Sequence, residues 1–193
     1  MEIARPKPHQ QIPPEAERVF GGILYDVYQW PQKLFDGKTA TYERLRRNDS
    51  VVILPVTERG TILVGREQQP GTEVYTAIPC GGVDDGETPE AAAARELLEE
   101  TGYVPAELDF WFAHQVEHRV DWAIFVFIAR GCKLVRKQDP GAGEKIELKE
   151  VSFDEFLHIV TEDDFQNLNI APKLLKAVLE PQEMILLKKR LGI

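Results

Sequence analysis

The sequence predicts a single α+β domain with a strand-rich extension at its N-terminus. Its 193 residues are enough for one well-buried domain and few for two, and no internal repeat or long linker divides them. Stretches rich in β-branched and aromatic residues, typical of strands, occupy much of the first half of the chain. Stretches with helix-start and helix-stop residues lie between and after them, so strands and helices share one fold.

The composition and charge argue against several classes of protein. Apolar residues make up 43% and charged residues 28%, values typical of a soluble globular domain. There are 32 acidic and 23 basic residues, and the resulting net charge of −9 opposes binding to a nucleic-acid backbone. Binding of small anionic ligands stays compatible with this net charge, because bound divalent metals reverse the sign of the local charge at a site.

Membrane and disulfide-scaffold classes are also excluded. Apolar runs such as 51–56 and 123–129 are far shorter than the roughly 20 residues that span a bilayer. The N-terminal residues contain no apolar core of a secretory signal. Cys80 and Cys132 are too few for a disulfide framework. We therefore expect a cytoplasmic protein with neither a membrane nor a nucleic-acid partner.

Two segments precede the main body of the domain. Residues 1–17 are polar and contain four prolines, a composition that predicts a flexible, loosely held arm. Residues 18–46 are rich in aromatic and β-branched residues, with a turn signal at Asp36-Gly37 between two strand-like stretches. Together with the body at 47–193 this strand extension forms one domain, residues 18–193.

Strands open the body. The apolar stretches 51–56 and 61–64 are expected to pair across a turn at Gly60, and 75–79 is expected to be a short strand. The other stretches of strand character are 108–116, 123–129 and 145–153, with a loop at 136–143.

Capping residues locate the helices. Thr88 is a suitable N-cap, Pro89 suits the first helical position, and Gly102 lies where a C-terminal cap belongs. Ser152 and Glu155 form a capping-box pattern that starts another helix. The helices after the first are expected at 154–160, 172–179 and 182–191.

The stretch 81–103, GGVDDGETPEAAAARELLEETGY, carries the clearest chemical signal. Glu96, Glu99 and Glu100 are spaced i, i+3 and i+4, so their carboxylates share one helical face. Like charges in this arrangement repel one another, and a hard divalent cation such as Mg²⁺, which prefers oxygen ligands, removes the repulsion. The alternative is an ordinary solvated acidic face.

The residues around these carboxylates favour a site over a solvated face. Gly81 and Gly82 allow close backbone approach, as phosphate-handling loops require. Arg95 is able to pair with Glu87 and so connect the loop to the helix. A rigid loop–helix unit of this kind holds metal ligands in place before the ligand arrives.

This stretch resembles the Nudix box, the signature of hydrolases that act on nucleoside diphosphates linked to another moiety. Tyr103 departs from the pattern, since it is aromatic where an aliphatic residue is usual. The residues that match in type and spacing are Gly81, Glu87, Arg95, Glu96, Leu97, Glu99, Glu100 and Gly102. The resemblance implies an α/β/α sandwich with a mixed sheet.

The resemblance also implies roles for individual residues. Glu96 and Glu100 would be the principal ligands of Mg²⁺, for which Mn²⁺ would substitute, and Glu99 would be a further ligand or the catalytic base. The backbone carbonyl of Cys80 would complete the metal site, and its thiol would have no chemical role. The box residues with a structural role would be Gly81, Glu87, Arg95 and Gly102.

Residues outside the box resemble the ADP-ribose and nucleotide-sugar pyrophosphatases of the family. The loop before the strand at 145 resembles their acidic loop, which makes Glu144 the candidate base and Glu147 its alternate. The N-terminal strands resemble the dimer interface of that branch, so a homodimer is expected. Trp30, Arg66 and Arg119 are the candidates for substrate binding.

The expected function is therefore hydrolysis of the P–O–P bond of a small nucleotide, ADP-ribose or a nucleotide sugar. The products would be a nucleoside monophosphate and a sugar phosphate. Two alternatives are a nucleoside triphosphate pyrophosphohydrolase of the same family, which releases pyrophosphate, and a non-catalytic module that senses a nucleotide.

Overall fold

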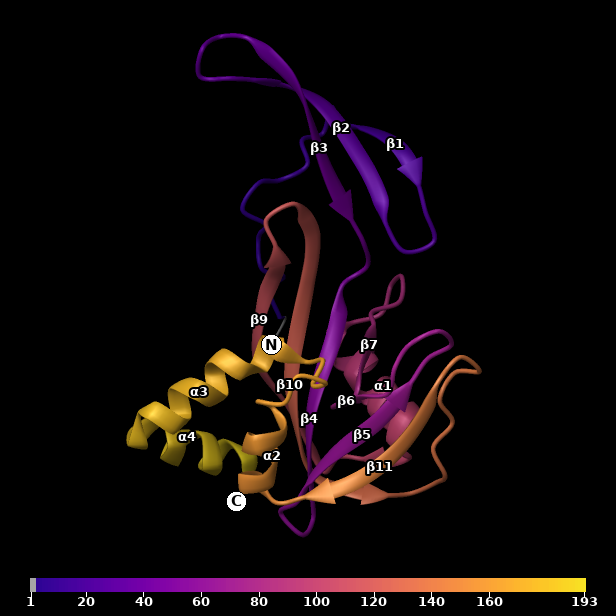
Figure 1. The fold of residues 1–193 in the computed structure, drawn as a ribbon, viewed down its shortest axis with the longest axis vertical. Coiled ribbons are helices and arrows are strands. Elements are labelled where there is room, and N and C mark those ends of the chain that lie inside the picture. Colours follow the sequence, from indigo (N-terminus) through magenta and orange to yellow (C-terminus); the bar gives the residue numbers. More distant parts are fainter. Residues whose placement is uncertain (1–2) are drawn as a thin grey trace.

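The computed structural model describes residues 3–193, apart from the side chain of residue 117 (Figure 1). Its centre is strand β10 (Val120–Leu134), which runs parallel to β4 (Ser50–Thr57) and antiparallel to β9 (Glu107–Glu117). All eight residues of β4 are buried, and the run 123–129 of β10 is buried too. Continuous burial of this kind requires cover on both faces of the sheet.

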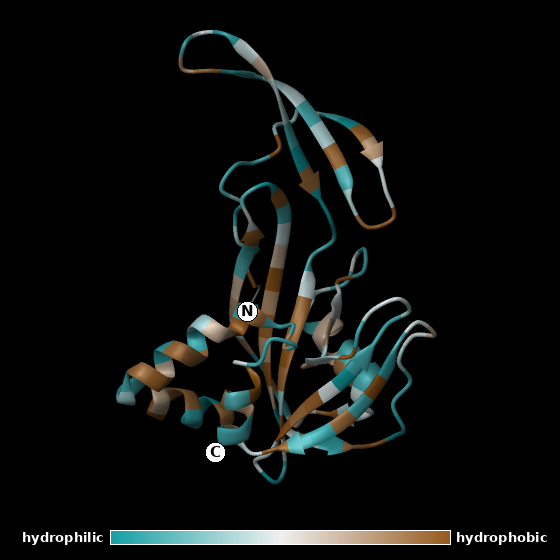
Figure 2. Ribbon diagram, in the orientation of Figure 1, coloured by the Kyte–Doolittle hydropathy of each residue, from teal (hydrophilic) through white to brown (hydrophobic). Residues whose placement is uncertain are grey.

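Helices supply that cover. Helix α1 (Pro89–Thr101) packs on one face, where Leu97 lies against Val51 and Phe125. The other face is covered by α2 (Phe153–Ile159), the 3-10 turn η1 (Leu168–Ile170), α3 (Ala171–Leu179) and α4 (Pro181–Leu191). Figure 2 shows the apolar character of β4 and β10 between these layers. The predicted α+β sandwich with a mixed sheet is confirmed.

A second group of strands forms the wall that faces α1. Strand β5 (Ile62–Gln68) pairs antiparallel with β11 (Lys145–Val151) and with β6 (Tyr75–Ala77). Strand β7 (Cys80–Gly82) pairs with β4, and the short β8 (Tyr103–Val104) pairs with β10.

The strand expected at 75–79 ends at Ala77, and a separate strand follows it, because the chain crosses there from one partner to another. Strand β6 ends at Ala77 on β5, and β7 begins at Cys80 on β4. Between them the Ile78 N–H donates to Asn167 Oδ1 (2.8 Å), and the Pro79 carbonyl accepts from the Ile53 N–H (2.8 Å). These bonds satisfy the backbone at the crossing.

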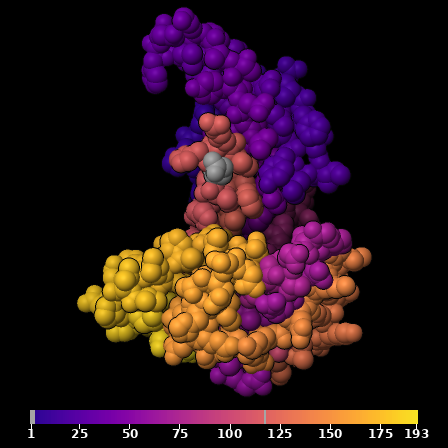
Figure 3. Space-filling model, viewed as in Figure 1, coloured from indigo at the N-terminus to yellow at the C-terminus, as the bar shows by residue number. Residues whose placement is uncertain are grey.

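The N-terminal strands form a separate antiparallel layer above the body (Figures 1 and 3). It contains β1 (Glu17–Gly21), β2 (Asp26–Lys33) and β3 (Thr39–Arg46). Only the end of β3 joins the main sheet, where Leu45 and Arg46 pair in parallel with the start of β10. The extension therefore meets the body near the β9–β10 turn.

The arm before β1 has no regular structure over residues 3–13, and several contacts attach it to the body, among them the His9 ring, 4.3 Å from the His118 ring. Arg5 forms ion pairs with Asp49 (2.7 Å) and Asp121 (2.8 Å). Gln115 donates to the Pro6 carbonyl (2.8 Å). The first two residues of the expected arm lie outside the described part of the chain.

Most predicted element ends agree with the structure to within a few residues. Ser152 accepts from the Glu155 N–H (3.1 Å) and starts α2 at Phe153, so β11 ends at Val151 and not at 153. Strand β10 is longer than the predicted 123–129, because β3 and β8 extend its pairing at the two ends. No helix among the described residues is long and apolar enough to cross a membrane.

Candidate active site

Local signals determine where the acidic helix begins and ends. The Thr88 hydroxyl accepts from the Ala91 N–H (3.2 Å), and Pro89 occupies the first turn. Gly102 ends the helix at φ 77°, and a Cβ there would lie 2.1 Å from the Arg136 carbonyl oxygen. Both the backbone conformation and the space therefore require glycine at this position.

Arg95 holds the loop before the helix. Its Nε and Nη2 donate to the two carboxylate oxygens of Glu87 (3.1 and 2.9 Å), and Nη2 also donates to the Gly82 carbonyl (2.9 Å). This fork lowers the pKa of Glu87, mainly through the hydrogen bonds from Arg95. The predicted loop–helix unit is present in the structure.

The same guanidinium contacts two of the box carboxylates. Arg95 Nη1 donates to Glu96 Oε1 (2.7 Å) and Glu99 Oε2 (3.2 Å), which reduces the repulsion along the helix. Glu96 lies directly over Gly81, where a Cβ would come within 2.1 Å of the Glu96 carboxyl group. Burial raises the pKa of Glu96 in spite of Arg95. Because Gly81 has no side chain, the half-buried Glu96 carboxylate is able to approach the loop backbone.

Glu100 is the most buried of the three box carboxylates, with 6% of the residue exposed. Its Oε2 accepts from the Cys80 N–H (3.1 Å), so the helix and β7 meet at this bond. Burial is the main cause that raises the pKa of Glu100 to about 9, and the charge of Glu67 is the next. A carboxylate in this environment requires a cation in order to stay ionised near neutral pH.

Glu67, on β5, is a functional candidate that the sequence reasoning missed. The residue is 8% exposed, and burial together with the charge of Glu144 raises its pKa to about 7. A Cβ at Gly65 would lie 2.7 Å from Glu67 Oε1, so the glycine leaves space for this carboxylate. The available signal was a glutamate two positions after a glycine, at the polar end of a strand that begins with three apolar residues.

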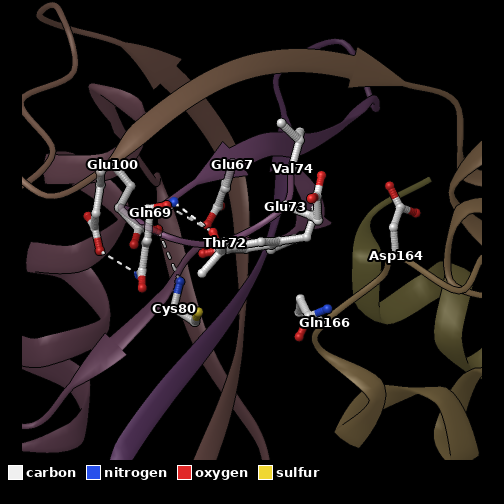
Figure 4. Close-up of a pocket in the computed structure, with 12 residues that line it drawn as sticks. Glu67, Gln69, Thr72, Glu73, Val74, Cys80, Glu100, Asp164 and Gln166 are labelled. Carbon is white, nitrogen blue, oxygen red and sulfur yellow. Dashed lines mark hydrogen bonds between the residues drawn. The ribbon is translucent and has the colours of Figure 1, made fainter.

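Glu67 and Glu100 face one cleft, called the acidic cleft below, with a volume of about 540 Å³, whereas Glu96 is not among its lining residues (Figure 4). Glu67 and Glu100 lie near Cys80 at one end, and Asp164 and Gln166 lie toward the other end. Gln69 donates to Glu144 Oε1 (3.4 Å), which brings the distant loop to the box. The lining residues are Glu67, Gln69, Thr72, Glu73, Val74, Tyr75, Ala77, Cys80, Glu100, Glu144, Asp164 and Gln166.

Comparison with known proteins agrees with this geometry. The NUDIX domain family matches residues 46–174, most of the chain. The chain belongs to the Nudix family. It is therefore a Nudix hydrolase, and the resemblance seen in the box is confirmed.

Two relatives and one solved structure extend the match beyond the box. The ADP-ribose pyrophosphatase of Bacillus subtilis is 31% identical over 147 residues, 75% of this chain and 80% of that protein. The methanol dehydrogenase activator of Bacillus methanolicus is 27% identical over 77% of this chain and 82% of that protein. The crystal structure of an ADP compounds hydrolase has a TM-score of 0.71 at 21% identity, covering 94% of this chain and 98% of that one, which shows a shared fold.

The donor set of the Nudix cleft fits a hard divalent cation. Burial is the main cause that raises the pKa values of Glu67, Glu96 and Glu100, and the charge of Glu144 adds to each rise, so these carboxylates lie near one another. None of the lining residues given above is a lysine or an arginine. No three acidic, histidine or cysteine side chains among the described residues are gathered closely enough to enclose a metal. The oxygen donors of the site therefore suit Mg²⁺, although the acidic side chains do not converge on a single metal position.

The other box-related candidates lie at different distances from this chemistry. The Cys80 backbone is beside Glu100, and burial raises the pKa of its thiol, which keeps the sulfur protonated and unreactive. Glu99 does not line the acidic cleft and faces Arg95. Glu147 is opposite Arg66 in the β11–β5 pair, outside the lining.

The structure does not bring the three predicted substrate residues together. Trp30 is 4% exposed and donates to Gln32 Oε1 (3.1 Å), so its ring has no free face for a nucleobase. Arg66 pairs with Asp164 (3.1 Å) beside the acidic cleft. Arg119 lines a different cleft near β3. Aromatic and basic residues of the strands were identifiable from sequence, whereas their positions relative to the box were not.

Proposed function

We propose that this Nudix hydrolase cleaves the diphosphate of a small ADP-linked substrate, ADP-ribose or a nucleotide sugar, with Mg²⁺ or Mn²⁺. The products are a nucleoside monophosphate and a sugar phosphate. The observation that carries the proposal is a cleft lined by five acidic residues and no basic ones, beside a complete Nudix box. Such a cleft accepts a diphosphate only together with cations. The relative named ADP-ribose pyrophosphatase supports the substrate class.

Glu96 and Glu100 would hold the cation, with the Cys80 carbonyl and Glu67 as further oxygen donors and Glu99 at the margin. When bound, the divalent cation neutralises the diphosphate and the charge that develops on the leaving phosphate. Arg95 and Glu87 keep the loop and helix in a fixed relation, so these oxygens are positioned before the substrate binds.

Glu144 is the base in this proposal. It lies in the loop before β11, half-buried, and its carboxylate lines the acidic cleft with Gln69 donating to it. From there Glu144 takes the proton of the attacking water, and the fixed orientation of its carboxylate favours transfer. Glu99 is less suited to this role, because its Oε2 is occupied by Arg95 and it lies outside the lining.

A substrate panel tests the proposed function. Phosphate release in Mg²⁺, coupled to a phosphatase, is measured with ADP-ribose, nucleotide sugars, NADH, a dinucleoside polyphosphate and nucleoside triphosphates. The Glu100→Gln variant is the blank. We expect one sugar-linked diphosphate to be turned over selectively, with a nucleoside monophosphate among the products. Pyrophosphate release from triphosphates would contradict the proposal, and nucleotide binding without any turnover would favour the sensor.

We also propose that the chain forms a homodimer through its N-terminal strands. Support comes from apolar side chains that the extension leaves exposed: Phe20, Ile23, Leu24 and Phe35. Grouped exposed apolar residues are typical of an interface. Helices α3 and α4 carry a second such group, which includes Leu179, and the control variant below tests it. Light scattering is expected to give a dimer mass for the wild type and for Leu179→Ser on α3, and a monomer mass for a double Ile23→Ser, Phe35→Ser variant. A wild-type monomer would overturn the dimer.

A reducing cytoplasm is the proposed location. Both cysteines are free thiols, Cys132 buried in the core and Cys80 in the wall of the acidic cleft. Thiols in these positions are compatible with a compartment that keeps them reduced.

A further inference from the structure

A buried arginine outside the acidic cleft has no hydrogen-bond partner for two of its nitrogen atoms. Arg44, on β3, is 2% exposed, and its Nε and Nη2 are buried without an acceptor among the described residues. Burial is the main cause that lowers the pKa of this guanidinium. Buried charged donors are ordinarily paired, so an unpaired one indicates a partner from outside the chain.

The nearest acidic group is already used by other residues. Asp121 acts on Arg44 only through its charge, while its two oxygens accept from Arg5 Nη2 (2.8 Å) and Arg46 Nε (3.4 Å). The neighbouring Glu43 accepts from Gln29 (2.7 Å) on β2. Neither of these carboxylates is hydrogen-bonded to Arg44 Nε or Nη2.

Arg44 borders a second cleft, of about 530 Å³, which we call the arginine cleft. Its lining residues are Gln10, Thr41, Tyr42, Glu43, Arg44, Leu45 and Arg119, and it shares none of them with the acidic cleft. Arg119 lies in the β9–β10 turn, where its carbonyl accepts from the Leu45 N–H (3.1 Å). That bond holds the second arginine beside β3, where Figure 3 shows the extension against the tip of the β9–β10 hairpin.

The residues of the arginine cleft match an oxyanion in type. Two of them, Arg44 and Arg119, are cationic, Thr41, Tyr42 and Gln10 carry neutral hydrogen-bond donors, and one, Glu43, is acidic. Guanidinium groups form paired, charge-assisted hydrogen bonds with phosphate oxygens. The volume is in the range of small-molecule sites.

We propose that the arginine cleft binds the phosphate group of a small metabolite, with Arg44 and Arg119 as the charged ligands. The site is separate from the acidic cleft and needs no metal, since the protein itself supplies the positive charge. It also joins the arm, the extension and the β9–β10 turn, so occupancy stabilises the attachment of the extension to the body.

The test measures thermal unfolding and calorimetric binding in EDTA, with inorganic phosphate and with AMP as probes and chloride at equal ionic strength as reference. Arg119→Gln is the principal variant because this residue is exposed. Arg44→Met removes the buried charge, and Arg59→Gln, an exposed arginine that pairs with Glu150 outside both clefts, is the matched control. Glu100→Gln separates this site from the acidic cleft.

We expect phosphate and AMP to raise the unfolding temperature of the wild type, Arg59→Gln and Glu100→Gln alike. Arg119→Gln should weaken binding about tenfold or more, and Arg44→Met should abolish it. Without phosphate, Arg44→Met should unfold no earlier than the wild type, because it loses an unpaired buried charge. A response to AMP but not to inorganic phosphate would still support the site and would assign it to phosphate monoesters.

Three results would overturn the proposal. One is the absence of any response of the wild type to either inorganic phosphate or AMP. Another is an equal response in the wild type and Arg119→Gln, which decides the question even if Arg44→Met does not fold. The third is a wild-type dimer that does not respond to either probe and that becomes a monomer in Arg44→Met. In that case the partner of Arg44 would be a carboxylate of the second copy. The outcome of the substrate panel affects none of these results.

Discussion

The acidic cleft of the body and the arginine cleft beside the extension leave charge of opposite sign without a partner. In the first, Glu67 and Glu100 lie buried with no lysine or arginine in the lining. In the second, Arg44 is buried with two unpaired nitrogen atoms. Asp121, which is also buried, is by contrast paired with Arg5 and Arg46. The contrast teaches that an uncompensated charge locates a ligand site, and that its sign indicates the ligand.

The largest effect should come from removing the charge of Glu100. We expect Glu100→Gln to lower kcat about 10³-fold, because a principal ligand of the cation is lost and metal stabilisation is worth several kcal/mol. Steady-state kinetics in Mg²⁺ measures this effect, and circular dichroism verifies folding. A variant that retains activity within about tenfold would show that the acidic cleft is not the catalytic site.

Glu144 provides the next test. Glu144→Gln should lower kcat by about 10²-fold with little change in KM, since a general base contributes roughly that factor in the transition state. Glu147→Gln on β11 is the matched control and should stay close to the wild type. A fall of less than about threefold would return the role to Glu99.

The stability of the metal-free protein should depend on pH through the acidic cleft. The pKa values of Glu67 and Glu100 are raised from 4.5 to about 7 and about 9, so the folded state binds these protons more tightly than the unfolded state. This stabilisation is fully present below pH 4.5 and is lost as pH rises through 7 and then 9.

We expect chemical denaturation in EDTA to show the free energy of unfolding falling by several kcal/mol from pH 5 to pH 9, since each unit of pKa difference is worth about 1.4 kcal/mol. Glu100→Gln should flatten the upper part of that curve, and added Mg²⁺ should do the same in the wild type. A wild-type curve that is flat in EDTA would mean that these carboxylates are better solvated than the structure shows.

The smallest effect concerns the support of the box. Arg95→Lys should destabilise the fold by about 1–2 kcal/mol, because a lysine cannot reproduce the paired hydrogen bonds to Glu87 and the bond to Gly82. Arg59→Lys, at a single exposed pair, should change stability by less than about 0.5 kcal/mol. Differential scanning calorimetry compares the two variants, and equal melting temperatures would contradict the role of Arg95.

The sequence by itself determined the features that depend on neighbours along the chain. Thr88 and Gly102 bound the acidic helix as expected, and the spacing of Glu87 and Arg95 was sufficient to predict their pairing. Capping and helical spacing act over a few residues, and the paired hydrogen bonds between Arg95 and Glu87 join residues only eight positions apart. Such rules need no knowledge of the rest of the fold.

Only the tertiary structure decided which distant residues share a cleft. Glu67 faces Glu100 because β5 crosses the wall opposite α1, and Glu144 joins them through a loop whose path the strand pairing of β11 determines. Trp30, expected at the substrate, is buried within the extension. Register, crossing and burial depend on packing between segments far apart in the chain. Periodicity and spacing identify candidate residues along the chain, but they do not predict which residues lie beside them in the folded protein.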